Sequence, residues 1–312
     1  LDKLINIPSD NWANYPKGVI KTFIDAGYKI DKGLDILFFG NIPNGAGLSS
    51  SASIELLTSV ILKENFKLNI DMIEMVKLSQ KAENNFIGVN CGIMDQFAIG
   101  MGKKDNAILL DCNTLEYHYA PVKLNGASIV IANTNKKRGL ADSKYNERRN
   151  SCEAAVKVLN KNGIDIKNLG ELSVKKFNEV KHFITDKEQL KRATHAVTEN
   201  ERTKTAVEEL NAGNVKAFGK LMNQSHISLR DDYEVTGFEL DSLVEAAWEA
   251  KGVIGARMTG AGFGGCTVSI VEDEFIDEFI KSVGKKYKSK TGLTADFYVA
   301  KIGDGSRKLG DF

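Results

Sequence analysis

A glycine- and serine-rich run at residues 43–53 has the residue types that phosphate binding requires. Gly45 and Gly47 allow tight turns and a close approach of the backbone to a ligand, and serines follow at once. The apolar periodicity that begins at Ile54 predicts a helix. Backbone N–H groups and the dipole at a helix start attract phosphate oxygens. The run lacks the lysine of a P-loop, so an ordinary serine-capped helix start is an alternative at this point.

Two acidic residues further along the chain could assist chemistry at a phosphate. Asp95 lies between Met94 and Gln96 in an otherwise apolar segment, where an unpaired carboxylate is costly to bury. It could be a general base, but it could also cap a helix or pair with a lysine. Glu83 stands twelve positions earlier in a helical pattern over 71–86, and by itself it fits the solvated face of that helix. The residue types alone leave both assignments open.

The elements that must position these residues alternate between helix and strand. Residues 34–40 are predicted to form a strand that leads into the glycine-serine run, and residues 88–102 a connection that carries Asp95. Beyond residue 127 the predicted order is strand, helices, strand, strand, helix, strand, with one long helix over 187–211. That order is typical of a split β-α-β unit with helical insertions. The sequence therefore predicts an α+β protein with two domains, residues 1–122 and 123–312.

The run at 43–53 resembles the phosphate loop of the GHMP kinases, and its triple serine is most similar to that of the galactokinases within this family. Further strings are similar to the same family in the same order, at residues 11–15, 91–96, 143–149, 228–233 and 256–265. They are spread over nearly the full length. The resemblance implies an S5 domain 2-like N-terminal domain, which binds ATP, and a ferredoxin-like C-terminal domain with helical insertions.

The resemblance also implies a role for each candidate residue. ATP would be bound by Gly45, Ala46, Gly47, Leu48, Ser49, Ser50 and Ser51. Mg²⁺ would be held by Ser51 and Glu83, and Asp95 would be the catalytic base. The sugar would contact Gly92, Asp95 and Tyr145. Trp12 would lie near the nucleotide, with a core or edge tryptophan as the alternative, while the glycines of 260–265 would be structural, with Thr259 a weak site candidate.

The implied reaction is transfer of the γ-phosphate of ATP to the C1 hydroxyl of α-D-galactose, which gives galactose 1-phosphate. Galactose and ATP would be the partners, with Mg²⁺ as cofactor. Two alternatives stay open: another GHMP sugar kinase, such as one acting on N-acetylgalactosamine, and a non-catalytic sensor of galactose and ATP. Sensors of this kind have an altered serine run, whereas Ser49–Ser53 is whole here, which favours catalysis.

One departure from the family concerns the sugar-binding signature Gly-Arg-Val-Asn-Leu-Ile-Gly-Glu-His-Thr-Asp-Tyr, which this sequence does not contain. That string supplies an arginine beside the catalytic aspartate, where it would stabilise developing phosphoryl charge. The chain also begins with Leu1 in place of Met. We therefore expect a truncated N-terminal domain and weak or no catalysis.

The composition excludes several other functions. With 42 basic and 41 acidic residues the net charge is +1, which gives no reason to expect nucleic acid or an anionic membrane as a partner. No apolar run approaches the roughly 20 residues that span a bilayer, and no secretory signal is visible. The widely spaced cysteines predict reduced thiols and no zinc site. We expect a cytoplasmic monomer, and we interpret the basic pair Arg148–Arg149 as a solvated helix face.

Overall fold

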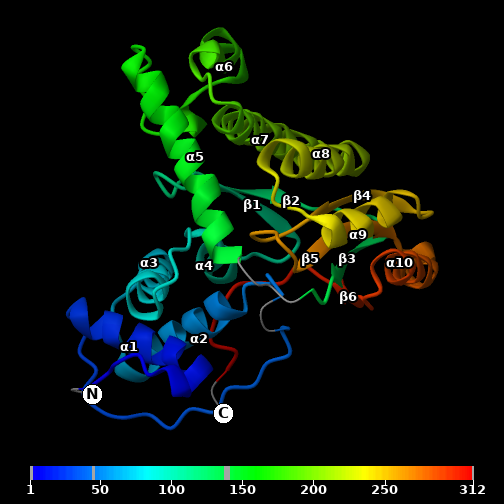
Figure 1. The fold of residues 1–312 in the computed structure, drawn as a ribbon. Helices are drawn as coiled ribbons and strands as arrows, with labels where there is room; N and C mark the ends of the chain where they lie inside the picture. The colour runs from blue at the N-terminus through cyan, green and yellow to red at the C-terminus, as the bar shows by residue number, and fades with distance from the viewer. Residues whose placement is uncertain (1–2, 44–45, 137–140, 311–312) are drawn as a thin grey trace. The chain divides into compact units, whose positions relative to one another are not determined.

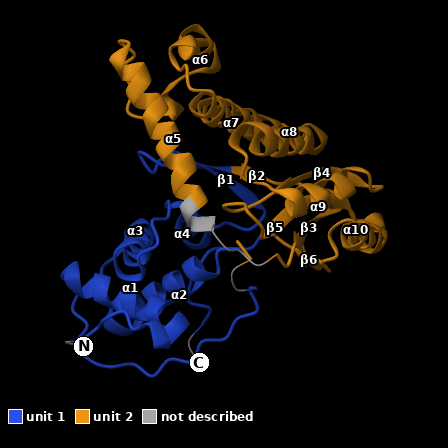
Figure 2. Ribbon diagram, in the orientation of Figure 1, with its two compact units in different colours: residues 1–44, 48–119, 302–312 blue, residues 45–47, 120–301 orange. Residues whose placement is uncertain are grey.

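The computed structural model describes residues 3–43, 46–136 and 141–310. The chain divides into two compact units (Figures 1 and 2). Unit 1 comprises residues 1–44, 48–119 and 302–312, and unit 2 comprises residues 45–47 and 120–301. The boundary between the units after residue 119 lies near the predicted domain boundary at residue 122. The units are not continuous in sequence, however, because residues 302–312 belong to unit 1 and residues 45–47 of the glycine-serine run belong to unit 2. We keep the two-domain division at residue 122 as a proposal.

Unit 1 consists mainly of helices (Figure 1). They enclose one apolar core. Its helices are η1 (Pro8–Ala13), α1 (Asn14–Asp25), α2 (Ser50–Phe66), α3 (Met72–Ala82), η2 (Glu83–Ile87) and α4 (Met94–Met101). The apolar positions that repeat along these helices meet in the core, as Phe23, Leu56 and Phe97 do. Two strands, β1 (Asn106–Leu110) and β2 (Tyr117–Pro121), follow and pair with each other, and the boundary after residue 119 falls within β2.

Two segments of unit 1 differ from the sequence-based prediction. Residues 88–102, predicted as a connection, contain helix α4, which is held in place because Phe97 is buried in the core. Residues 34–40, predicted as a strand, join no sheet in the part of the chain that the structure describes. Leu37 and Phe39 of this segment are 94% and 92% exposed. An apolar run is not sufficient for a strand, because a strand also needs a neighbouring backbone to pair with.

Unit 2 contains an antiparallel sheet of four strands in the order β4-β5-β3-β6. The strands are β3 (Ala127–Asn133), β4 (Val253–Met258), β5 (Cys266–Glu272) and β6 (Asp296–Ala300). Helices α9 (Phe238–Trp248) and α10 (Ile276–Thr291) pack on it through an apolar core that includes Val130, Leu243 and Phe279. This strand order is that of the predicted split β-α-β unit, so the ferredoxin-like prediction is confirmed.

The predicted helical insertions lie between β3 and β4 (Figure 1). They are α5 (Ala141–Lys161), η3 (Leu169–Glu171), α6 (Val174–Val180), η4 (Lys181–Phe183), α7 (Lys187–Asn211), α8 (Val215–Ser228) and η5 (Leu229–Tyr233), and a last short turn, η6 (Asp273–Phe275), precedes α10. Helix α7 has the predicted bounds. It is joined to η5 by Arg192, whose fully buried guanidinium donates to the Asp232 carbonyl at 2.6 Å and to the Glu234 carboxylate at 2.7 Å.

A buried histidine on α7 makes the stability of the chain sensitive to acid. The Nδ1 atom of His195 lies 3.0 Å from the Ser228 hydroxyl, which donates to Asp232 at 2.8 Å. Burial lowers the pKa of His195 to about 4. Between that value and the ordinary histidine pKa near 6.5, the unfolded chain binds a proton that the folded chain does not, so stability falls as the pH drops through this window.

We expect His195→Gln to remove this part of the acid sensitivity. As the pH is lowered from 7 to 4, the wild type should lose on the order of 1–3 kcal/mol of unfolding free energy relative to the variant. Urea denaturation at a series of pH values measures the difference. His182→Gln is the matched control, because His182 is exposed. A difference between wild type and His195→Gln that stays constant over this pH range would contradict the assignment.

Candidate active site

The predicted phosphate loop leads directly into the first turn of α2. Gly47 has φ +75°, Ser49 is left-handed with φ 57°, and the helix begins at Ser50. Ser49 is the N-cap residue of this helix, but its side chain makes no capping hydrogen bond. A helix start without a side-chain cap presents backbone N–H groups that suit an anion. Of the seven residues predicted to bind ATP, Gly45 lies outside the described residues.

Within unit 2, the glycine-rich loop that joins β4 to β5 approaches the phosphate loop closely. A Cβ atom on Gly260 would lie 3.1 Å from the Gly47 carbonyl oxygen, and Gly260 has φ +75°. Both the space and the backbone conformation therefore favour glycine at this position. The backbone N–H of Thr259 donates to the Cys266 carbonyl at 2.9 Å and holds the ends of the loop together. These contacts agree with a structural role for the loop glycines.

Glu83 is the buried carboxyl at which several elements of unit 1 meet. It begins η2, a π-helical turn, and it is 7% exposed, so a solvated helix face is excluded. Gln96 on α4 donates to its Oε2 atom at 2.6 Å, and the side chains of Ser51 and Cys91 also hydrogen-bond to it. Burial raises the pKa of Glu83 despite these hydrogen bonds. Ser51 and Glu83, the two residues predicted to hold Mg²⁺, are thus direct neighbours.

Asp95 lies in the first turn of α4, beside this carboxyl. Its side chain is exposed, whereas its apolar neighbours suggested burial, because Gln96 and Phe97 face the interior in its place. Ile93 is the N-cap of α4, so the alternative that Asp95 caps the helix is wrong. Besides burial, the charge of Asp95 also raises the pKa of Glu83, and Gln96, the residue after Asp95, bonds directly to Glu83. Asp95 is accessible to a substrate and adjacent to the predicted metal ligands.

Glu55 is a carboxyl at this site that the sequence analysis missed. It lies one turn after Ser51 on α2 and is fully buried. Burial, reinforced by the negative charge of Glu83, raises the pKa of Glu55 to about 8. The sequence contains one signal that could have revealed it: an acidic residue within the apolar run that follows the phosphate loop.

The residues predicted to contact the sugar belong to different units. Gly92, in unit 1, is exposed, and a Cβ atom there would meet no protein atom within 4 Å. Packing within the described protein therefore does not require glycine at this position. The space beside its Cα atom is open to a ligand. Tyr145 lies near the start of α5 in unit 2 and is 38% exposed, so its phenol is accessible.

The start of α5 is anchored by Arg148, three residues after Tyr145. The guanidinium of Arg148 donates to the backbone carbonyls of Tyr233 at 2.8 Å and Glu234 at 3.1 Å. Its interpretation as part of a solvated face was therefore wrong, because the arginine bonds to the backbone of another element.

Trp12, predicted near the nucleotide or in the core, is 53% exposed and makes an edge contact with Phe38 at 5.6 Å. Of the alternatives for Trp12, a core residue is excluded.

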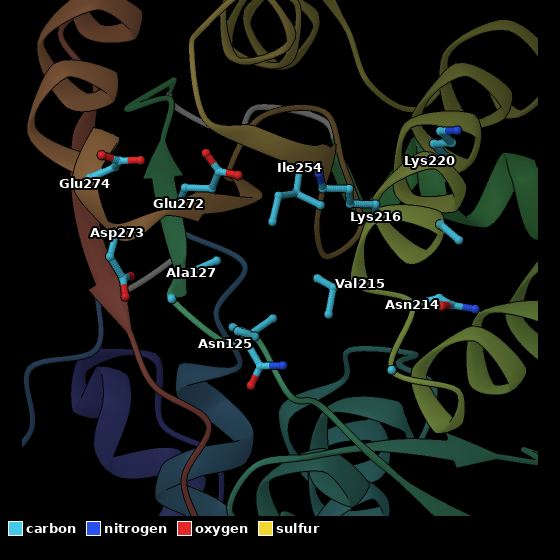
Figure 3. A pocket seen from close by; sticks show the side chains of 14 residues that line it. Asn125, Ala127, Asn214, Val215, Lys216, Lys220, Ile254, Glu272, Asp273 and Glu274 are labelled. Carbon is cyan, nitrogen blue, oxygen red and sulfur yellow. The ribbon is translucent and has the colours of Figure 1, made fainter.

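A surface groove of about 950 Å³ also lies within unit 2 (Figure 3). Lys216 and Lys220 of α8 contribute positive charge, and Glu272, Asp273 and Glu274 contribute negative charge. Residues of both signs make it a poor match for a polyanion such as ATP. None of the residues predicted to act in the reaction lines it.

Ser51 and Glu83 supply few ligands for a metal ion by themselves. Among the described residues, no three His, Cys, Asp or Glu side chains converge in a way that could hold one. A hydroxyl and a carboxylate nevertheless suit Mg²⁺, which keeps several waters and takes further oxygens from substrate phosphates.

In the described part of the chain, no helix has the length and apolar character needed to cross a membrane.

Family models and known proteins agree on the relationship of this chain. The model described as GHMP kinases N terminal domain matches residues 14–103, and the model described as GHMP kinases C terminal matches residues 206–289. The chain is 75% identical over 309 residues to a galactokinase from Fusobacterium nucleatum and 57% identical over the same length to one from Bacillus subtilis. Each alignment covers 99% of this chain and 79% of the relative.

Solved structures show the same relationship. A crystal structure of Lactococcus lactis galactokinase complexed with galactose superposes with a TM-score of 0.95 at 52% identity, covering 99% of this chain and 79% of that one. The mevalonate kinase of Methanococcus jannaschii shares the fold with a TM-score of 0.62 at 21% identity, covering 96% of this chain and 78% of that one. The chain therefore belongs to the GHMP kinases and, within that family, to the galactokinases.

Proposed function

We propose that this chain transfers the γ-phosphate of ATP to the C1 hydroxyl of α-D-galactose and releases galactose 1-phosphate. The observation that carries the proposal is the 75% identity to a galactokinase over 99% of the chain. The relatives named above include neither an N-acetylgalactosamine kinase nor a sensor protein, so those alternatives gain no support. The expectation of weak catalysis, which rested on the absent signature string, also finds no support in these comparisons.

Phosphoryl transfer depends on positioning and charge stabilisation more than on covalent chemistry by the protein. The uncapped start of α2, with residues 45–51, would bind the phosphates of ATP through backbone N–H groups and serine hydroxyls. The left-handed backbone at Gly47 and Ser49 sets the turn that brings the chain to this helix start. This part of the proposal assigns binding and orientation to the loop.

The donor set of Ser51 and Glu83 fits a magnesium ion. Their oxygens are hard ligands that already contact each other, and a cation would favour the ionised form of a carboxyl whose pKa burial raises. When bound, Mg²⁺ would neutralise charge on the phosphates and orient them. Glu83 would hold the ion through its carboxylate and Ser51 through its hydroxyl oxygen.

Asp95 would act on the acceptor sugar. Its exposed carboxylate would accept the hydrogen bond of the C1 hydroxyl and take its proton as the oxygen bonds to phosphorus. Gly92 and Tyr145 would contact other hydroxyl groups of the sugar. The exposure of both residues supports this assignment, since each is accessible to a ligand.

A coupled assay that follows ADP release tests the function. We expect turnover with galactose that requires both ATP and Mg²⁺, and at least about 10³-fold lower kcat/KM with glucose, because a site built to bind a hydroxyl rejects an analogue that misplaces it. N-acetylgalactosamine is the second sugar to compare. Phosphorylation of N-acetylgalactosamine in preference to galactose would contradict the proposal, as would ATP binding without transfer to any sugar.

A methyl group at Gly92 is expected to weaken sugar binding without affecting the fold. Gly92→Ala has space within the protein and no positive φ to strain, so the melting temperature should stay unchanged. The methyl group would occupy space next to the substrate and raise the KM for galactose by about 10-fold or more. Steady-state kinetics and thermal melts measure the two effects. An unchanged galactose KM would remove Gly92 from the proposed sugar site.

Gly126→Ala is the matched control for that experiment, since a Cβ atom there also meets no protein atom within 4 Å. Its φ of +87° makes the substitution strained, so this control is expected to lower stability and leave the galactose KM unchanged. Comparison of the two variants therefore separates an effect on galactose binding from an effect of backbone strain on stability.

A cytoplasmic location and a monomeric state are further parts of the proposal. Cys91, Cys112 and Cys152 form no disulfide, which fits a reducing compartment. Burial, with Glu83 adding to it, raises the pKa of the Cys91 thiol to about 12, so this cysteine stays protonated and unreactive at neutral pH.

A further inference from the structure

The buried carboxyl of Glu55 has no role in the reaction proposed above. Its Oε2 atom accepts a hydrogen bond of 3.1 Å from Nε2 of Gln96, and its Oε1 atom has no hydrogen-bond partner among the described residues. Both side chains are fully buried. An unpartnered buried oxygen destabilises a fold, and an apolar side chain of similar volume would be more favourable for stability alone. Glu55 is therefore unsuited to a purely structural role.

The same nitrogen atom of Gln96 also donates to Glu83, at 2.6 Å. A carboxamide nitrogen has two hydrogens, and here each has a different carboxyl as its acceptor. Because the two acceptors lie on α2 and η2, they fix the orientation of the amide plane. Removal of either acceptor would allow the amide to rotate and would release the other carboxyl.

These contacts close a ring of four side chains within unit 1. Ser51 hydrogen-bonds to Glu83, Glu83 accepts from Gln96, and Gln96 donates to Glu55. Glu55 lies one turn after Ser51 on the same face of α2, so the helix itself completes the ring. The ring includes both proposed metal ligands. Gln96 is also the residue that directly follows Asp95 in the first turn of α4.

We infer that Glu55 and Gln96 are positioning residues, which hold the Glu83 carboxylate toward the metal and fix the turn of α4 that carries Asp95. This inference rests on the proposed function, because the roles of Glu83 and Asp95 belong to that proposal. Neither residue touches substrate in this assignment. Their effect is transmitted through the hydrogen bonds of one carboxamide, as is common for residues that orient a metal ligand.

The test compares Glu55→Leu with Glu55→Gln. Leucine has a similar volume but no acceptor, whereas glutamine keeps a carbonyl oxygen for Gln96. Binding of Mn²⁺ in the presence of a non-hydrolysable ATP analogue is measured by electron paramagnetic resonance, together with kcat and KM for galactose. We expect Glu55→Leu to weaken Mn²⁺ binding and lower kcat by about 10-fold or more, with the galactose KM unchanged, and Glu55→Gln to stay within about threefold of wild type.

A stability control separates positioning from folding. Ser79→Ala removes a buried hydrogen bond of 3.0 Å between α3 and Ser59 on α2 and changes none of the four side chains of the ring. We expect this variant to melt at a lower temperature with unchanged Mn²⁺ affinity. Glu55→Leu should melt at a higher temperature and bind Mn²⁺ more weakly, because it removes a costly buried carboxyl from the fold. If Glu55→Leu does not fold, Gln96→Met is expected to give the same loss of Mn²⁺ affinity.

Equal Mn²⁺ affinity and kcat in Glu55→Leu and Glu55→Gln would overturn this inference. So would a Glu55→Leu variant that loses stability alone, as the Ser79→Ala control does. Failure of the proposed function gives a different result, since the wild type itself would then bind no Mn²⁺ with the nucleotide or would phosphorylate no galactose. The wild-type measurement therefore distinguishes the two failures.

Discussion

Replacement of Asp95 by asparagine is expected to lower kcat about 10²–10⁴-fold, which is the usual contribution of a positioned base. Asparagine keeps the shape of the side chain but cannot take the proton of the acceptor hydroxyl. Asp95 is exposed, so the change should leave the fold intact and the melting temperature within about 2 °C of wild type. Steady-state turnover with saturating galactose and ATP measures the effect.

Asp277→Asn provides the matched control for that substitution. Asp277 is also an exposed aspartate in the first turn of a helix, α10, but it is not part of the proposed site. Both variants lose one surface charge near a helix N-terminus, where an acidic residue is mildly stabilising. We expect the control to keep full turnover. Near-normal turnover in Asp95→Asn would refute the role of Asp95 as the base.

Replacement of Glu83 by glutamine should lower kcat/KM about 10²–10³-fold, a loss comparable to removal of one electrostatic group at a reacting centre. Glutamine can still accept the hydrogen bond from Gln96, but it lacks the negative charge that a divalent ion requires. We also expect a higher Mg²⁺ concentration for half-maximal rate. Rates over a series of Mg²⁺ concentrations, at fixed galactose and ATP, measure both quantities.

The stability of Glu83→Gln distinguishes a metal ligand from a structural residue. Burial raises the pKa of Glu83, so the ionised form is unfavourable in the fold without a cation, and the neutral amide should melt at an equal or higher temperature. A structural carboxyl would show the reverse, with a lower melting temperature and an unchanged Mg²⁺ requirement. Glu116→Gln, an exposed loop carboxyl of unit 1, is the control and should change neither property.

Features that depend on neighbours along the chain could be predicted from the sequence. The helix over 187–211 has its predicted bounds, and the strand order of unit 2 follows from the order of its apolar segments. The phosphate loop could be predicted because its glycines and serines are contiguous, and Glu83 and Asp95 were predicted through resemblance to a family. Each of these signals lies within one short stretch of residues.

Features that depend on partners far along the chain could not be predicted in this way. Glu55 was not identified from the sequence, because the role we infer for it depends on Gln96, 41 positions later in the sequence. Arg148 looked solvated until the backbone of Tyr233 and Glu234 supplied its acceptors. Residues 34–40 have the composition of a strand but pair with none in the described ranges.

The sequence by itself determined the family, the glycine-serine run proposed to bind phosphate and the acidic residues available for chemistry, because those are properties of residue type and local order. Only the tertiary structure decided which carboxyls are buried, which is exposed and which share a hydrogen-bond donor. The physical reason is that burial and hydrogen bonding act between atoms that packing brings together, and both set the charge state of a carboxyl. A periodic pattern along one helix contains no information about the side chains that a second helix places against it.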